Sequence, residues 1–361
     1  MTDVEAAIAR LAREESGHVL ALLAHRFGDL DLADEAVQDA LVRAVTAWRK
    51  DGIPHNPPGW LYTVAHNLGV DRFRREASAR RRLTASAPDL VNATQQDNEE
   101  ELIVEHSDVG DEHLRLLLLC CHPALDQNAQ IALTLRLAGG LRTTEIAAAL
   151  LLPEATLAQR VVRAKRKIRA AGIPLSIPEK LDERIGSLLG VLYLIFNEGY
   201  LSRSSEHTMR VDLVDEAIRL TRQLGVMLPE SAEIRGLLAL ELFTAARSNS
   251  RFSGGTLVLL DQQDRTRWDL ATIAEANEVL TTALHHMQPG PFQLQALIAA
   301  HHANAPSAPD TDWPLIARLY DHLASVAPSP IIDLNRAVAL AMADGPLAGL
   351  AALDLIVGID H

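Results

Sequence analysis

The sequence predicts an all-α protein, and three observations support that prediction. Ala and Leu dominate the apolar residues, whereas aromatic residues make up only 4% of the chain, and this composition favours helices over sheets. Apolar residues recur at spacings of three and four, as they do on the buried face of a helix. Gly, Pro and Asn interrupt these patterns where turns are expected. With 361 residues, the chain is long enough for two or three domains with their own cores.

Residues 1–77 are expected to form the first domain, in which a helix over 1–27 packs against two further helices. The first of these two follows Gly28 and buries a stripe of apolar residues: Ala33, Val37, Leu41, Ala44 and Trp48. Another side of the same helix is acidic. Its polar residues are Asp31, Asp34, Glu35, Gln38 and Asp39. The pattern predicts an exposed acidic stripe along the helix.

The second of these helices follows a Pro-rich break at 54–58. Its buried residues are expected to be Leu61, Val64, Ala65 and Leu68. Its exposed or boundary residues are Trp60, His66, Asn67, Asp71, Arg72, Arg74 and Arg75. Such a face suits single-stranded DNA, because aromatic rings stack on bases, amides bind base edges and guanidinium groups bind phosphates. The alternative is two ordinary amphipathic helices with solvated outer faces.

The residues of these two helices, DLADEAVQDAL and WLYTVAHNLGVDRFRR, resemble region 2 of bacterial sigma factors of the extracytoplasmic-function (ECF) group. The resemblance implies that the acidic stripe docks on the coiled coil of the β′ subunit of RNA polymerase. It also implies that the second helix melts and reads the −10 promoter element with the exposed residues named above. Both helices match the family in the same order and spacing.

Residues 78–110 are expected to form an acidic linker. Helical periodicity fades there, and Ser, Pro, Asn and acidic residues take over, as in the run QQDNEEE. In sigma factors the corresponding segment threads the RNA-exit path of the polymerase, so the resemblance implies that route. A solvated tether is the alternative.

Residues 111–172 are expected to form a second domain that ends in a helix-turn-helix. Thr143 or Thr144 is predicted to cap a short helix, TEIAAALLL, and a turn at Leu152 and Pro153 leads into a longer basic helix. The longer helix would bury Leu157, Val161, Ala164 and Ile168. The second helix of such a motif enters the major groove of DNA.

The pattern T-L-x-x-R-x-x-R-A-K-R-K-I in this helix resembles region 4 of the same sigma family, which reads the −35 element. The resemblance implies contacts with promoter DNA and with the β flap of RNA polymerase. The implied DNA contacts are Thr156, Gln159, Arg160, Arg163, Lys165 and Arg166. Gln159 and Arg163 are the base-reading candidates, whereas the remaining basic residues are expected to contact phosphates. Ala158 stands where relatives often carry a larger or basic residue, which leaves the preferred −35 sequence open.

Residues 173–361 are expected to form a helical-repeat extension after a Pro-bounded junction at 173–178. The predicted helices cover 181–200, 211–224, 231–246, 268–287, 291–302, 313–326 and 331–343. The last helix pair resembles a tetratricopeptide repeat. The whole arrangement resembles a sigma subgroup with such an extension, in which the phrases NEGY and DLNRAVA recur. Helical repeats offer surfaces for a regulatory protein or peptide. A purely structural cap is the alternative, and the end of the chain soon after a helix leaves truncation of a longer protein open.

Charge and cysteine content narrow the class of protein. The net charge is −13, with about −3 before residue 173 and about −10 beyond it. This balance argues against indiscriminate nucleic-acid binding, but basic patches at 72–82 and 136–169 suit contact with DNA at chosen points. Cys120 and Cys121 fit neither a disulfide framework nor a zinc site, so a reduced cytosol is expected. The chain has neither a secretory leader nor an 18-residue uncharged span, and we expect a soluble cytoplasmic protein with no membrane partner.

No catalytic constellation is evident in the sequence, and we expect no enzyme activity, no cofactor and no metal. Phosphate-binding glycine loops, nucleophile elbows and Cys/His zinc sets do not occur. The His pairs at 285–286 and 301–302 are adjacent on predicted helices, where their side chains diverge by about 100°. The favoured function is a promoter-specificity subunit of RNA polymerase, regulated by its extension. The alternative is an independent helix-turn-helix regulator whose helical domain senses a ligand or a protein.

Overall fold

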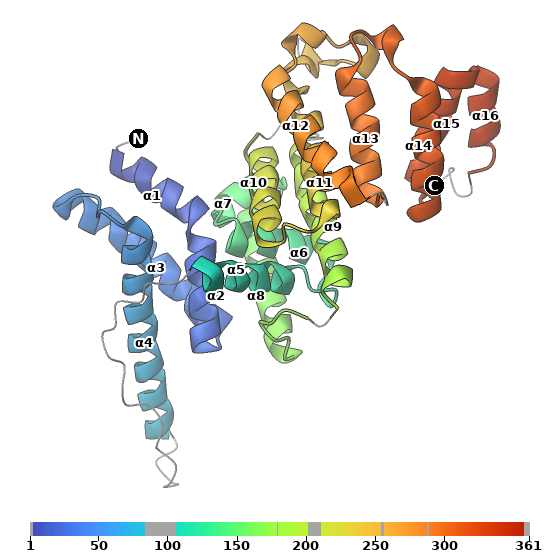
Figure 1. Ribbon diagram of the computed structural model, residues 1–361. Helices are drawn as coiled ribbons and strands as arrows, with labels where there is room; N and C mark the ends of the chain where they lie inside the picture. Colours follow the sequence, from blue (N-terminus) through green and yellow to red (C-terminus); the bar gives the residue numbers. More distant parts are fainter. Residues whose placement is uncertain are drawn as a thin grey trace. The chain divides into compact units, whose positions relative to one another are not determined.

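The computed structural model describes residues 3–83, 106–178, 180–200, 211–253, 256–286 and 289–356, and these residues are almost entirely helical (Figure 1). The predicted all-α class is therefore confirmed. A small antiparallel hairpin was not expected: β1 (Phe252–Ser253) pairs with β2 (Thr256–Leu257). The chain divides into two compact units, residues 1–191 and 192–361. The division falls inside helix α9 (Leu181–Tyr200).

The first unit begins with four helices: α1 (Asp3–Glu14), α2 (Ser16–Phe27), α3 (Leu30–Asp51) and α4 (Pro57–Leu83). The single helix predicted over 1–27 is thus two helices, separated at Glu15. Helix α2 ends at Gly28, whose φ of 64° is in the left-handed region that glycine adopts most readily. Asp29 then starts α3, because its side chain accepts hydrogen bonds from the backbone N–H groups of Asp31 and Leu32 at 2.9 and 3.0 Å.

Helices α3 and α4 pack through the predicted apolar faces. The buried residues of α3 include Ala33, Val37, Ala44 and Trp48, and those of α4 are Leu61, Ala65 and Leu68. Trp48 and Trp60 meet edge to face, with ring centroids 5.5 Å apart. Gly69 lets α4 approach Phe27, because a Cβ atom at this position would lie 2.4 Å from the Phe27 ring. Packing therefore fixes α4 against both α2 and α3.

The remaining helices of the first unit are α5 (His106–Cys120), α6 (Gln127–Leu133), the π-helical turn η1 (Thr134–Ala138), α7 (Thr143–Ala149) and α8 (Glu154–Ala170). The ends of the predicted linker 78–110 are helical, since α4 continues to Leu83 and α5 begins at His106. Residues 84–105 lie outside the described residues. The predicted turn between α7 and α8 is present, and Leu151 there has a φ of 52°.

The predicted Thr cap of α7 is wrong. The residue before the helix is Arg142, and Thr143 and Thr144 lie in the first turn. Glu145 supplies the acceptor instead, because its carboxylate receives the backbone N–H of Arg142 at 2.8 Å and the Arg142 guanidinium at 2.8 Å. A carboxylate in the first turn that binds back to the preceding N–H satisfies a free backbone donor at the helix start.

Helix α2 connects the two halves of the first unit. It packs against α3 and α4 on the N-terminal side, and against α5 and η1 on the side that leads to the helix-turn-helix. The approach is close at Gly17, where a Cβ atom would lie 2.5 Å from the carbonyl oxygen of Ala138. His18 of α2 stacks on His113 of α5 with ring centroids 4.2 Å apart. At the start of α9, Arg184 donates a 2.6 Å hydrogen bond to the carbonyl of Leu118. The first compact unit therefore extends past the predicted junction at 173–178.

The second unit contains α10 (Val211–Met227), α11 (Ala232–Ala245), α12 (Leu270–Ala283), α13 (Pro291–Asn304), α14 (Trp313–Val326), α15 (Pro330–Asp344) and α16 (Pro346–Leu353). Short 3₁₀ turns connect several of them: η2 (Ser248–Ser250), η3 (Leu260–Gln262), η4 (Arg265–Arg267), η5 (Leu284–His286) and η6 (Ala308–Asp310). Most helices pack against the next in the chain, and α11 also packs against α13 (Figure 1).

The core of the second unit includes two apolar clusters among the described residues. One includes Leu242, Phe243 and Trp268, and the other includes Leu294 and Ile316. The predicted helices agree with these elements within a few residues at their ends. Helix α15 is not buried on all of its apolar sides. It exposes an apolar stripe at helical spacing: Ile331, Leu334, Val338 and Met342.

Candidate polymerase and promoter interface

The acidic side of α3 carries the residues predicted to dock on polymerase, but these residues differ in exposure. Glu35 is exposed, and Asp31, Gln38 and Asp39 are half-buried. Asp34 retains only 8% of its accessible surface. The predicted exposed stripe is therefore wrong at Asp34, because another helix covers it.

The outer side of α4 carries the residues predicted to contact the −10 element. Exposed side chains are Asn67, Asp71, Arg74 and Arg75, while Trp60, His66 and Arg72 are half-buried. His66 lies between two rings, with centroids 5.9 Å from Phe27 and 6.0 Å from Tyr62. Trp60 and His66 are thus partly used in packing. The amide and guanidinium groups of α4 remain available to a nucleic-acid strand.

Helix α8 presents one exposed polar side, formed by Thr156, Gln159, Arg163 and Arg166. Their spacing of three and four residues places these side chains along one face of the helix. The buried side of α8 consists of Leu157, Val161, Ala164 and Ile168, as predicted. A helix that packs on one side and projects amide and guanidinium groups on the other has the form of a recognition helix.

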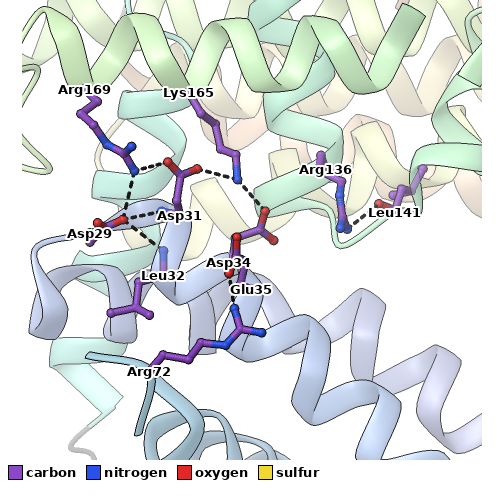
Figure 2. A network of polar contacts seen from close by, with 10 residues as sticks. All are labelled: Asp29, Asp31, Leu32, Asp34, Glu35, Arg72, Arg136, Leu141, Lys165 and Arg169. Atoms are coloured by element: carbon purple, nitrogen blue, oxygen red, sulfur yellow. Dashed lines mark hydrogen bonds and ion pairs between the residues drawn. The ribbon is translucent and has the colours of Figure 1, made fainter. Parts of the chain in front are cut away.

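A group of ion pairs links α3 and α8, which we call the α3–α8 ion-pair cluster (Figure 2). Its members are Asp29, Asp31, Asp34, Lys165 and Arg169. Lys165 Nζ lies 2.9 Å from Asp31 Oδ1 and 2.9 Å from Asp34 Oδ2. Arg169 contacts Asp31 and lies 3.4 Å from Asp29 Oδ1. Two residues predicted to dock on polymerase therefore bind a residue predicted to contact DNA.

The electrostatics of Lys165 favour this pairing. Burial by itself lowers the pKa of Lys165, but the carboxylates of Asp34 and Asp31 offset that effect, and the net pKa is raised. Lys165 is consequently charged at physiological pH, and its side chain and that of Asp34 each retain 12% exposure. Each group would be left as a largely buried, unpaired charge if its partner were removed, which is costly.

Two further ion pairs join α3 and α4. Arg72 contacts Glu35 and lies 2.6 Å from Asp39 Oδ2. Arg72 was predicted to contact DNA, and in the structure it holds two residues of the predicted docking stripe. Opposite charges on helices that pack together explain both this pairing and the α3–α8 ion-pair cluster. Sequence reasoning missed Asp29 and Arg169, because neither the cap residue of α3 nor the end of α8 carries a motif that signals pairing.

The described ranges offer little to other kinds of site. These residues contain no group of three or more His, Cys, Asp or Glu side chains placed to hold a metal ion. Cys120 and Cys121 are buried free thiols; burial raises the pKa of Cys121 to about 12, against a smaller opposing effect of its hydrogen bond with Thr134. Across the same residues, each helix falls short of the length or apolar character that a membrane span requires.

Comparison with known proteins assigns the two regions of the first unit. Residues 11–79 match the Sigma-70 region 2 family, and residues 115–168 match the Sigma-70 region 4 family. Residues 184–284 match a family of unknown function, DUF6596. The tetratricopeptide-like character of the extension has no counterpart among these matches, and it stays a prediction.

A relative extends the match across nearly the whole chain. The chain is 42% identical over 333 residues to an uncharacterized protein of Rhizobium meliloti (strain 1021), which covers 91% of this chain and 78% of that protein. No solved structure matches the chain. The Sigma-70 regions support an RNA polymerase sigma factor, whose partners are core polymerase and promoter DNA. The chain therefore belongs to the same family as the Rhizobium meliloti protein and carries regions 2 and 4 of a Sigma-70 factor.

Proposed function

We propose that the chain is an ECF-group sigma factor that directs core RNA polymerase to specific promoters and is regulated by its C-terminal helical extension. The observation that carries this proposal is the pair of exposed polar faces in one compact unit. Helix α4 exposes Asn67, Arg74 and Arg75, and α8 exposes Gln159 and Arg163. The amide and guanidinium groups of α4 suit binding to a melted DNA strand, and those of α8 suit binding to base edges in duplex DNA.

The alternative function is an independent helix-turn-helix regulator of duplex DNA. That function would need only the exposed side of α8. It leaves the acidic residues of α3 and the amide and Arg residues of α4 without a role. The Sigma-70 region 2 match over residues 11–79 also favours the first function.

The α3–α8 ion-pair cluster supports a closed state of the free protein. Asp34 cannot bind a polymerase subunit and Lys165 at the same time, because it is almost fully covered in the pair. Docking of α3 on the β′ coiled coil therefore requires α8 to move away. The same movement would release Lys165 for a phosphate. We infer that polymerase binding and opening of the unit are coupled.

Binding measurements with and without core polymerase test this function. Free full-length protein should bind a promoter duplex weakly at physiological salt, and it should bind core polymerase tightly. Fluorescence titration of the labelled protein with core enzyme, followed by titration of the complex with promoter fragments, measures both steps. Tight and sequence-specific promoter binding by the free protein, with no measurable affinity for core polymerase, would favour the independent regulator.

A further inference from the structure

Four basic side chains gather in the second unit, and we call them the arginine cluster: Arg247, Arg251, Arg265 and His302. Arg247 and Arg251 flank η2 after the end of α11. Arg265 begins η4, and its Nη1 donates 2.7 Å hydrogen bonds to the backbone carbonyls of His302 and Ala305 at the end of α13. The fold thus brings together basic groups from three separate segments.

Arg247 and Arg251 are unusual because neither guanidinium is paired with a carboxylate in the described part of the chain. The Nε atoms of both are buried there without a hydrogen-bond acceptor. The guanidinium of Arg251 lies over the ring of Tyr200, with its carbon 3.9 Å from the ring centroid. A buried guanidinium normally binds a carboxylate or several carbonyls, because an unpaired buried charge is costly. Arg265 makes such bonds, whereas the buried Nε atoms of the half-buried Arg247 and Arg251 have no acceptor.

The charges of the cluster also act on one another. Burial lowers the pKa of Arg247, and the charge of Arg251 lowers it further, while Tyr200 opposes both effects. Burial and the charge of Arg247 likewise lower the pKa of Arg265. Burial, Arg247 and Arg265 together lower the pKa of His302 to about 4. The cluster is therefore a local region of positive potential in a unit whose overall charge is negative.

The backbone that carries the cluster is held by specific contacts. Trp268 Nε1 donates a 2.7 Å hydrogen bond to Ser250 Oγ, and the Arg265 guanidinium carbon lies 4.5 Å from the Trp268 ring centroid. The N–H of Val258 donates to the carbonyl of Arg251 at 2.8 Å. Basic groups fixed in this way are pre-organised, so an anion that binds them need not first order them.

We propose that the arginine cluster binds a phosphoryl group, either inorganic phosphate or the phosphate of a small metabolite. Arg247 and Arg251 would donate to the phosphate oxygens, and Arg265 would add positive potential, whereas His302, with a pKa of about 4, is neutral at physiological pH and would become easier to protonate once the anion binds. Guanidinium groups match the geometry of phosphate, and two negative charges balance several cations better than one carboxylate does. Three of the four residues and Tyr200 lie in the match to the family of unknown function, residues 184–284. This site is independent of the proposed promoter function.

The chain's own carboxylates are the competing counterions, and Asp310 already raises the pKa of Arg265 against the effects of burial and Arg247. Segment 201–210, which follows Tyr200, contains a single carboxylate, Glu206, together with Arg203 and Arg210. Its sequence therefore adds more positive than negative charge. Substitution of Glu206 therefore distinguishes two cases: a cluster that binds external phosphate, and a cluster that is neutralised by an ion pair with Glu206.

Thermal unfolding of the full-length protein tests the proposal, with inorganic phosphate as the probe and sodium chloride at equal ionic strength as the reference. Phosphate at 10 mM should raise the Tm of the second unit by about 2–5 °C, as expected for a Kd of about 1 mM. R247Q and R251Q should lose this shift. The control R222Q should keep it, because Arg222 makes an exposed ion pair with Glu275 at 2.7 Å in the same unit. The sodium chloride reference and the R222Q control correct for the general stabilisation that phosphate gives any protein.

Two further measurements keep the proposal testable if a variant folds poorly. Calorimetric titration of the wild-type protein with phosphate and with pyrophosphate should show saturable binding, and tighter binding of pyrophosphate would point to a nucleotide-like ligand. Phosphate should also raise the pKa of His302 in an NMR titration, because an anion offsets the neighbouring guanidinium charges. Equal Tm shifts in wild type, R251Q and R222Q would overturn the proposal. So would absence of a phosphate effect combined with a loss of stability in E206Q, since Glu206 would then be the counterion.

Discussion

Lys165 of the recognition helix α8 lies 2.9 Å from Asp34 of the acidic helix α3, and each side chain retains only 12% exposure. The contact connects two helices that we propose bind different partners, one polymerase and the other promoter DNA. We propose that this contact keeps Asp34 from polymerase and Lys165 from DNA in the free protein until polymerase competes for α3.

Reversal of one charge should disrupt the α3–α8 ion-pair cluster. K165E would place a carboxylate beside Asp31 and Asp34, and we expect the free energy of unfolding of the first unit to fall by about 1.5–3 kcal/mol, or the unit to open. Small-angle scattering would report opening as an increase in radius of gyration, and urea unfolding would report the loss of stability.

The double variant K165E/D34K should recover much of the loss, because it restores a pair of opposite charges. R166E serves as the matched control, since Arg166 is the next residue, carries the same charge and is exposed. If R166E and K165E have the same effect, or if the double variant recovers nothing, the cluster does not hold the closed state.

Gln38 tests the docking stripe without altering the ion-pair cluster. It is half-buried on α3 and belongs to the residues that we propose contact polymerase. Q38A should weaken the affinity for core polymerase by several fold while thermal unfolding stays close to wild type. R43A is a suitable control, because Arg43 is exposed on the same helix but lies five residues from Gln38, away from its face. Wild-type affinity in Q38A would remove this part of α3 from the docking surface.

Arg163 should read a base of the −35 element. Its side chain is exposed on the outer face of α8, and a guanidinium bidentate to guanine contributes about 1–3 kcal/mol of discrimination. R163A, assayed as holoenzyme on a randomised −35 library, should relax preference at one base pair. R166A should instead weaken all sequences alike and reduce the salt dependence of binding. An even loss across the library in both variants would make Arg163 a phosphate contact.

The sequence predicted the helices and their buried faces well, because apolar spacing reports burial directly. Leu157, Val161, Ala164 and Ile168 of α8 are buried as predicted. It could not predict which charged residues pair across helices, as Lys165 and Arg72 show. Pairing depends on how the helices pack, and the packing of α2 through Gly17 leaves no periodic signal. The arginine cluster was missed for the same reason, since its members come from three segments.

Glu241 should make the stability of the second unit depend on pH. Burial raises the pKa of Glu241 well above its usual value, and a 3.3 Å hydrogen bond from Thr221 offsets only part of this effect. In the unfolded chain this carboxyl ionises above about pH 4.5. The folded state therefore loses stability as pH rises from that value through the folded pKa, by up to about 1.4 kcal/mol per pH unit.

E241Q removes this titration, so the stability of the variant relative to wild type should increase from pH 5 to pH 9 in urea unfolding. E275Q is the control, because the side chain of Glu275, the partner of Arg222, retains 42% exposure. Parallel pH profiles of wild type and E241Q would mean that Glu241 does not titrate abnormally in the folded protein.

Run-off transcription with core RNA polymerase tests the central claim most directly. Core enzyme, full-length protein and a genomic fragment library would be combined, and the transcripts sequenced from their 5′ ends. The proposed function predicts that the protein starts transcription at a defined set of promoters with shared −35 and −10 sequences, that core enzyme alone does not, and that R163A alters the shared −35 sequence. Transcripts with no dependence on the added protein, from a preparation that binds duplex DNA by itself, would contradict it.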